Sequence, residues 1–195
     1  MAHKILFKSL ETPNQLKPYF RQKNNMNISD NKVVALNYYL TASKDNAAEQ
    51  LIEETSKEHP FVFLFGFGGV LPDFESNLNG KKAGDRFDFK INAENGYGLY
   101  EKDYVVKIDR AAFVVDGKFD DERVKVGRDL EMSDADGNPL TGNILSISDT
   151  EVEMDFNHPL AGQELHFIGE VLDVREASQE ELDHGHVHGP HGHHH

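Results

Sequence analysis

Cysteine is absent from this sequence of 195 residues, which excludes thiol catalysis, disulfide bonds and zinc sites built on cysteine. Long apolar runs are absent too, and no stretch approaches the roughly 20 apolar residues that a membrane-spanning helix needs. The run Ile5-Leu6-Phe7 is too short and too interrupted to form the core of a signal peptide. We therefore expect a cytoplasmic protein with no membrane partner, and the lack of cysteine is consistent with a reducing compartment.

Basic residues are scarce, since 20 lysines and arginines stand against 34 aspartates and glutamates, giving a net charge of −14 at pH 7. Proteins that bind nucleic acid neutralise phosphates with clustered lysine and arginine, so this balance argues against a nucleic-acid partner. A strongly acidic surface keeps a chain soluble through charge repulsion. We therefore expect an acidic monomer.

The apolar residues are spaced as in a mostly β protein of the α+β class. With 38% hydrophobic residues, the chain can bury a core in one domain or in two small ones. Residues 32–40 and 60–65 are rich in valine, tyrosine and phenylalanine, and residues 86–92 alternate in polarity, which predicts three strands. Pro72 opens an amphipathic stretch that ends near Gly80 and predicts a short helix.

Residues 101–154 differ in texture from the rest of the chain. Turn signals such as Asp116-Gly117 and Asp136-Gly137 separate short apolar runs, a pattern typical of a small β-rich module. Residues 164–174 predict a final strand, and residues 1–25 are interpreted as a poorly ordered leader. The apolar runs of the module are Val105–Val106, Val124–Val126, Asn143–Ile147 and Glu151–Met154.

Histidine is concentrated at the C-terminus, where the last dozen residues hold seven of the chain's eleven. Imidazoles on a flexible, glycine-spaced chain can gather around one cation, so we interpret the tail as metal-binding. An expression tag is the alternative, but tags are usually unbroken runs. The tail also follows a helix signal, with Ser178 as N-cap and Glu181 three residues later. The seven are His184, His186, His188, His191, His193, His194 and His195.

Motifs for nucleotide, calcium or acid–base chemistry are incomplete. Gly66–Gly69 lacks the third spaced glycine of a dinucleotide loop and the Lys-Ser/Thr of a P-loop, which leaves a turn. Asp134–Asn138 begins like a calcium loop, but Leu145 stands where the bidentate glutamate belongs, so a hairpin turn is favoured. Glu53 and Glu54 are adjacent on a strand and therefore point to opposite faces, which argues against a catalytic pair.

Aromatic residues are the remaining candidates for a site. Five of them fall on separate predicted elements, each near the end of an element or near a glycine. Composition alone favours a core rich in phenylalanine, and a binding site is the alternative. The five are Tyr38, Phe63, Phe74, Tyr97 and Phe167.

Four motifs from Asn31 onward stand in one order. Residues 82–88 read Lys-Ala-Gly-Asp-Arg-Phe-Asp, and residues 95–98 read Asn-Gly-Tyr-Gly. Residues 157–167 read Asn-His-Pro-Leu-Ala-Gly-Gln-Glu-Leu-His-Phe, and residues 174–188 join an Arg-Glu-Ala segment to the first histidines of the tail. The last two motifs are specific, whereas the Tyr-Gly turn alone would be weak. In this order they resemble the SlyD-type FK506-binding-protein (FKBP) family of peptidyl-prolyl cis-trans isomerases.

The resemblance implies an FKBP-like fold, in which an antiparallel sheet wraps on a short helix. In this family a β-rich insert-in-flap domain interrupts the flap beside the active site, and its two crossings would lie near Tyr100 and Asp155. The domains expected are a leader (1–25), a discontinuous isomerase domain (26–100 and 155–176), the insert with chaperone activity (101–154), and a C-terminal helix with the histidine tail (177–195).

The resemblance also implies a proline pocket. Phe74 would form its floor, Tyr97 would donate its hydroxyl to a substrate carbonyl, and Tyr38 would support the wall. The chain departs from the family where Ile52 and Glu53 replace an aromatic-Asp pair and where Asp73 replaces a common glycine. Phe65 and Phe67 also stand where many relatives carry histidine. The pocket residues implied are Tyr38, Ile52, Glu53, Phe63, Val70, Leu71, Phe74, Tyr97 and Phe167.

The function implied is isomerisation of X-Pro bonds, with no cofactor required. The substrates would be X-Pro peptides and unfolded or nascent polypeptides, and metalloenzyme maturation proteins are candidate partners. The tail would bind Ni²⁺, with Zn²⁺ or Cu²⁺ as competitors. The alternative function is a holdase chaperone or metal carrier whose isomerase site is weakened, which the departures at Glu53 and Asp73 leave open.

Overall fold

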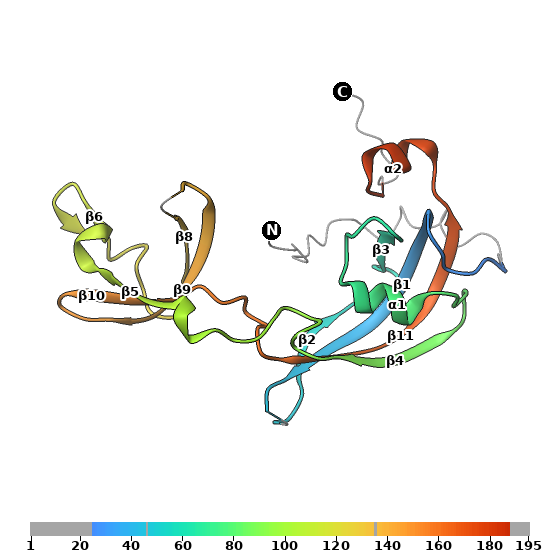
Figure 1. Ribbon diagram of the computed structural model, residues 1–195, viewed down its shortest axis with the longest axis horizontal. Coiled ribbons are helices and arrows are strands. Elements are labelled where there is room, and N and C mark those ends of the chain that lie inside the picture. The colour runs from blue at the N-terminus through green and yellow to red at the C-terminus, as the bar shows by residue number, and fades with distance from the viewer. Residues whose placement is uncertain (1–24, 46, 135, 188–195) are drawn as a thin grey trace. The chain divides into compact units, whose positions relative to one another are not determined.

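The computed structural model describes residues 25–45, 47–134 and 136–187 (Figure 1). It consists of two main antiparallel sheets, a two-stranded ribbon and short helices, which confirms the predicted mostly β, α+β fold. The expected leader, residues 1–25, lies outside the described part except for Asn25. Among the described helices, none has the length and apolar character required to cross a membrane.

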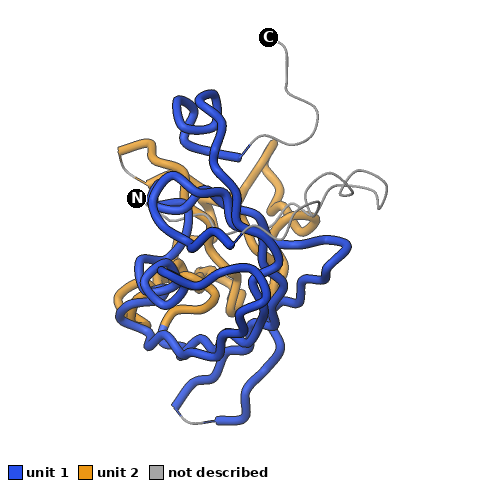
Figure 2. Tube along the Cα trace, turned by 90° about the vertical axis from the view of Figure 1, so that its right-hand side faces the viewer, with its two compact units in different colours: residues 1–97, 162–195 blue, residues 98–161 orange. Residues whose placement is uncertain are grey.

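The chain divides into two compact units, coloured separately in Figure 2. Unit 1 contains residues 1–97 and 162–195, and unit 2 contains residues 98–161. Unit 1 is therefore assembled from two segments that are distant in sequence.

Unit 1 is built on the pairing of β1 (Lys32–Ser43) with β11 (Glu164–Glu176), which are antiparallel along the whole of β1. Side chains alternate between the faces of a strand, so Leu36, Tyr38 and Leu40 lie on one buried face of β1. On its other edge, β11 pairs with β4. β3 and β2 pair with successive stretches of β1. These strands are β2 (Gln50–Glu54), β3 (Phe61–Leu64) and β4 (Arg86–Ile91).

A short helix, α1 (Pro72–Leu78), lies on one face of this sheet (Figure 1). Pro72 occupies the first turn, where its missing N–H leaves no hydrogen bond unmade, which is why the helix begins there. Phe74 and Leu78 are four residues apart and both are buried. A helix of this length is marginal by itself, so these two contacts with the sheet hold it in place.

Gly169 allows the strands to approach closely at the centre of the sheet. It lies opposite Tyr38 of β1 and Phe87 of β4. A Cβ at this position would stand 2.6 Å from the Cζ of Phe87 and 2.8 Å from the Cβ of Tyr38, and it would also overlap the Asn37 carbonyl. Only glycine leaves room for the Tyr38 and Phe87 side chains at this point of the sheet.

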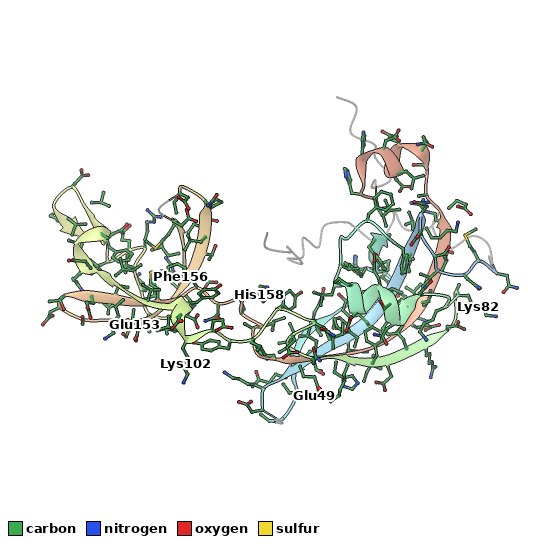
Figure 3. All side chains as sticks on the ribbon, in the orientation of Figure 1. Glu49, Lys82, Lys102, Glu153, Phe156 and His158 are labelled. Carbon is green, nitrogen blue, oxygen red and sulfur yellow. The ribbon has the colours of Figure 1, made fainter. Side chains whose placement is uncertain are left out.

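Unit 2 has a four-stranded sheet in the order β5-β10-β9-β8 with its own core. Ile144, Val152 and Met154 are fully buried there, and Phe156, labelled in Figure 3, packs against them. Three of the four apolar runs form strands, whereas Val124–Val126 is irregular and Val124 fills the core from a loop. The strands are β5 (Val105–Asp109), β6 (Val114–Val115), β7 (Lys118–Phe119), β8 (Asp129–Ser133), β9 (Pro139–Ile147) and β10 (Glu151–Asp155), with 3₁₀ helices at Lys102–Tyr104 and Arg110–Phe113.

Hydrogen bonds join the two ends of unit 2. The Asn157 side chain accepts from the Glu101 N–H and donates to the Glu101 carbonyl, both at 2.9 Å. The Tyr100 hydroxyl donates to Asp155 at 2.9 Å, and the Phe156 N–H donates to a backbone carbonyl at 2.9 Å. The entering and leaving segments of the unit are therefore held side by side.

The second helix, α2 (Gln179–His184), is fixed at both ends. Ser178 caps it and Glu181 completes the capping box, as the sequence predicts, while Gly185 ends it with a φ of 71°. Arg175 of β11 donates to both carboxylate oxygens of Glu181, at 2.9 and 2.7 Å. Burial alone would raise the pKa of Glu181, but Arg175 and the Ser178 backbone N–H outweigh it and lower the pKa to about 2.

Glu181→Gln tests the contribution of the Arg175–Glu181 ion pair to stability. A folded-state pKa below the ordinary value of 4.5 means that ionised Glu181 stabilises the fold above about pH 4.5 and that this stabilisation is lost as the pH falls toward 2. The variant should lower the free energy of unfolding by about 1–3 kcal/mol at pH 7, as expected for a charge-assisted pair. The difference should shrink toward zero near pH 2–3, as measured by thermal unfolding.

Glu180→Gln is the matched control, because Glu180 is an exposed neighbour in the same helical turn. It should leave stability within about 0.5 kcal/mol of wild type. A Glu181→Gln effect that stays constant between pH 7 and pH 2 would contradict the linkage.

Candidate functional site

Four aromatic side chains converge in unit 1 from four different elements. Ring centroids lie 4.9 Å apart for Phe74 and Phe167, 5.6 Å for Tyr38 and Phe167, and 5.9 Å for Phe63 and Phe74. Edge-to-face geometry is favoured for such rings and fixes their orientations. The four are at most 6% exposed. We call Tyr38, Phe63, Phe74 and Phe167 the aromatic cluster.

Two further phenylalanines extend the cluster, and the sequence did not single them out. Phe61 stacks on Phe63 at 5.6 Å and meets Tyr38 edge-on at 5.8 Å. Phe89 lies 5.8 Å from Phe74 in β4. The alternation of phenylalanine at positions 61 and 63 and at positions 87 and 89 carries the signal, because alternate residues share a face of a strand.

Glu53 is the acidic group at the cluster. The Tyr38 hydroxyl donates to its Oε2 at 2.7 Å. Burial raises the pKa of Glu53, although the hydrogen bond from Tyr38 opposes this. Burial and the Glu53 carboxylate together raise the pKa of Tyr38 far above its ordinary value. The pair therefore holds a neutral phenol in a fixed orientation, and nothing in this geometry makes Glu53 a catalytic acid.

Ile52 owes its place to an irregularity in β2. Leu40 pairs with Glu53 and Thr41 pairs with Leu51, so Ile52 is the extra residue of a β-bulge. A bulge re-aims the side chains around it, and here it accompanies the turn of Glu53 toward Tyr38. Ile52 itself is 41% exposed.

Val70 and Leu71 connect the glycine turn to α1. Both are buried, and the Leu71 carbonyl accepts from the backbone of the first helical turn. The Gly66 N–H donates to the Glu75 side chain at 2.9 Å, which ties the turn to the helix. These contacts give the two aliphatic side chains fixed positions next to Phe74.

Tyr97 belongs to a turn that follows β4. It is half-buried, and burial raises the pKa of its hydroxyl, with a second contribution from the charge of Glu53. The Glu53 carboxylate is therefore close enough to Tyr97 for its charge to disfavour ionisation of the hydroxyl. The adjacent Gly96 is closely packed, since a Cβ there would stand 3.1 Å from the Asn92 carbonyl.

The two phenylalanines near the glycine turn differ in exposure. Phe65 is buried, and its ring lies 6.3 Å from that of Phe63, so it extends the apolar wall. Phe67 is 39% exposed. Only the first is part of the ring network.

Two of the seven histidines of the tail, His184 and His186, lie within the described residues. The rings of His184 and His186 stack with centroids 5.7 Å apart at the end of α2. Within the described residues, no group of three His, Asp or Glu side chains gathers in a way that would hold a metal ion. His188, His191, His193, His194 and His195 lie outside the described residues.

His166 is enclosed by carboxylates on the sheet of unit 1. Its ring nitrogens lie 2.7 Å from Asp88 and 3.1 Å from Glu49, which is labelled in Figure 3. Burial lowers the pKa of His166, but the two carboxylates outweigh it and raise the pKa overall. Its role is therefore an ion pair across strands.

Comparison with known proteins agrees with this architecture. The sequence model of the FKBP-type peptidyl-prolyl cis-trans isomerase family matches residues 24–116. The chain is 38% identical to the FKBP-type peptidyl-prolyl cis-trans isomerase SlyD of Yersinia pestis over 84% of this chain and 79% of the relative. The corresponding protein of Haemophilus influenzae is 36% identical over 85% of this chain and 82% of the relative, and that of Escherichia coli K12 is 35% identical over 85% and 80%. The chain therefore belongs to the FKBP-type peptidyl-prolyl cis-trans isomerases, with SlyD proteins among its relatives.

Proposed function

We propose that the aromatic cluster lines the proline pocket of this isomerase and acts on X-Pro bonds of unfolded or partly folded proteins. The observation that carries the proposal is the convergence of four buried rings, with the Tyr38–Glu53 pair beside them. The full set proposed is Tyr38, Ile52, Glu53, Phe63, Val70, Leu71, Phe74, Tyr97 and Phe167.

The reaction suits a site of this composition. Rotation about an X-Pro bond faces a barrier of about 18–20 kcal/mol, because the amide must lose its resonance. The twisted amide has less charge separation than the planar one, so a dry apolar surface favours it over the ground state. No bond to the enzyme forms and no proton must move, which is why the reaction needs no cofactor.

Each side chain then has a role in holding the twisted amide. Phe74, 3% exposed and in contact with Phe167, forms the floor under the prolyl ring. Tyr97 donates its hydroxyl to a substrate carbonyl. Tyr38, oriented by Glu53, supports the wall.

Tyr97→Phe tests this assignment, since it removes one hydroxyl and keeps the ring. The loss of one hydrogen bond to the substrate should lower kcat/KM on X-Pro peptides about tenfold. Phe74→Ala should lower it further, but it also leaves a cavity that costs about 3–5 kcal/mol of stability, so Tyr97→Phe is the cleaner variant. NMR exchange spectroscopy of the cis and trans peptide measures both.

Tyr39→Phe is the matched control, because Tyr39 lies on the opposite face of β1 from Tyr38 and is 49% exposed. It should retain wild-type turnover. An unchanged kcat/KM in Tyr97→Phe would refute the role of the hydroxyl. A wild-type protein that leaves the exchange rate of several X-Pro peptides unaltered would refute the pocket and favour the alternative, a holdase or metal carrier with a weakened site.

In this proposal the insert, residues 101–154, binds segments of unfolded polypeptide through its exposed apolar side chains. Tyr104, Val115 and Val126 are 56%, 56% and 63% exposed, and in this proposal they contact apolar segments of an unfolded chain. An unfolded segment held there would keep its X-Pro bonds near the pocket at an effective concentration of roughly millimolar. We propose that the insert gives the protein chaperone activity.

Replacing residues 101–154 by a short loop should sharply lower turnover on an unfolded protein while activity on short peptides survives. Tyr104→Ser with Val126→Ser is a milder version that leaves the core of unit 2 intact, and it should lower turnover in the same selective way. Refolding limited by a proline isomerisation measures the first activity, and peptide exchange measures the second. Equal loss on both substrates would argue against capture by the insert.

We also propose that the histidine tail binds Ni²⁺, with Zn²⁺ or Cu²⁺ competing. Neutral imidazole suits all three ions, and the paired rings of His184 and His186 offer two donors next to the fixed end of α2. These two and His188 have the least chain entropy to lose on closing around an ion. Metalloenzyme maturation proteins in the cytoplasm are the partners that such a carrier would serve.

Changing His184, His186 and His188 to alanine should abolish the tightest site in calorimetry with Ni²⁺. Deleting residues 189–195 should keep that site and lower only the stoichiometry. Because only neutral imidazole binds the ion, affinity should fall as the pH is lowered. Peptide isomerisation should survive both changes, and an unaltered nickel affinity in the alanine variant would refute the assignment.

A further inference from the structure

We propose that Asp73 and Asn95 form a positioning pair that holds Tyr97 at a fixed place relative to Phe74. The Asn95 Nδ2 donates to the Asp73 Oδ2 at 2.8 Å, which joins α1 to the turn after β4 across 22 residues of sequence. The inference rests on the proposed function, in which Phe74 and Tyr97 contact the substrate. It gives a role to Asp73, the residue that stands where glycine is common in the family.

The helix provides a rigid base for the pair. Asp73 stands in the first turn of α1, directly before Phe74. Phe74 is 3% exposed and packs against Phe167 with ring centroids 4.9 Å apart, which fixes the helical turn on the sheet. The Asn77 side chain donates to the Asp73 main-chain carbonyl at 2.8 Å and stabilises the same turn.

Hydrogen bonds within the turn after β4 couple the position of Asn95 to that of Tyr97. The Asn92 side chain accepts from the Asn95 N–H at 2.9 Å, and the Asn92 carbonyl accepts from the Gly96 N–H at 2.9 Å. A Cβ at Gly96 would stand 3.1 Å from the Asn92 carbonyl, so the backbone is closely packed in the turn that leads to Tyr97. Anchoring Asn95 therefore restrains Tyr97, which is two residues later.

A restraint of this kind affects turnover more than folding. Asn95 is exposed, so its hydrogen bond contributes little to the stability of unit 1 as a whole. The reaction depends on placing the prolyl ring on Phe74 and the carbonyl on Tyr97 at the same time, and small misplacements are costly in such sites. The expected signature is a loss of kcat/KM at an unchanged melting temperature.

A double-mutant cycle in the full chain tests the pair. Asp73→Ala and Asn95→Ala should each lower kcat/KM on an X-Pro peptide about threefold to tenfold, the range expected for one hydrogen bond. The double variant should lose no more than the larger single loss, because both changes remove the same contact. The exchanged pair, Asp73→Asn with Asn95→Asp, restores a donor and an acceptor in the opposite sense and should recover activity to within about twofold of wild type.

Two further variants separate positioning from general structure. Ser76→Ala removes an exposed side-chain hydrogen bond to the Pro72 carbonyl in the same helix and leaves the bonds of Asp73 in place, so it should keep wild-type kcat/KM. In a Tyr97→Phe background, Asp73→Ala should have no further effect, because the pair acts through the Tyr97 hydroxyl. A purely structural role would persist in that background.

The outcomes also separate this inference from the proposed function. If wild-type protein accelerates exchange and both alanine variants equal it, the positioning pair is refuted and the isomerase site stands. Additive losses, or an exchanged pair as slow as the alanine variants, would also refute it. If wild-type protein does not accelerate exchange, the proposed site fails and the pair fails with it.

Discussion

The antiparallel pairing of β1 with β11 is the constraint on which unit 1 depends. It joins strands that have the whole of unit 2 between them in the sequence. Closing so long a loop costs chain entropy, and that cost is lower when the intervening residues fold by themselves and their ends are already joined, as Asn157 joins them to Glu101. The pairing then sets Leu40 opposite Phe167 and Tyr38 opposite Gly169, and the aromatic cluster follows from this register.

A site of packed rings does what isomerisation requires because it presents a dry and rigid surface. The edge-to-face contacts leave the rings little freedom to lose when a prolyl ring binds. Glu53 is compatible with this surface because its carboxylate accepts from Tyr38 and is thereby satisfied despite partial burial. In our proposal this carboxylate acts by orienting Tyr38, and the bulge at Ile52 directly precedes it in β2.

The fold class, the short helix at Pro72 and the capping box at Ser178 could be predicted because each depends on local sequence signals. The motifs further identified the family. Side-chain contacts between distant elements could not be predicted in this way, which is why Phe61 and Phe89 were missed and why the Asp73–Asn95 bond is a finding of the structure. The bulge in β2 likewise depends on pairing with β1, which no spacing within β2 reveals.

The most direct test of the account is to observe where an X-Pro peptide sits while its bond isomerises. NMR of the wild-type protein with a labelled peptide can record cis–trans exchange and intermolecular contacts in one sample. The account predicts accelerated exchange together with contacts from the prolyl ring protons to the rings of Phe74 and Phe167 and to Tyr97. Accelerated exchange with prolyl contacts confined to residues 101–154 would contradict it.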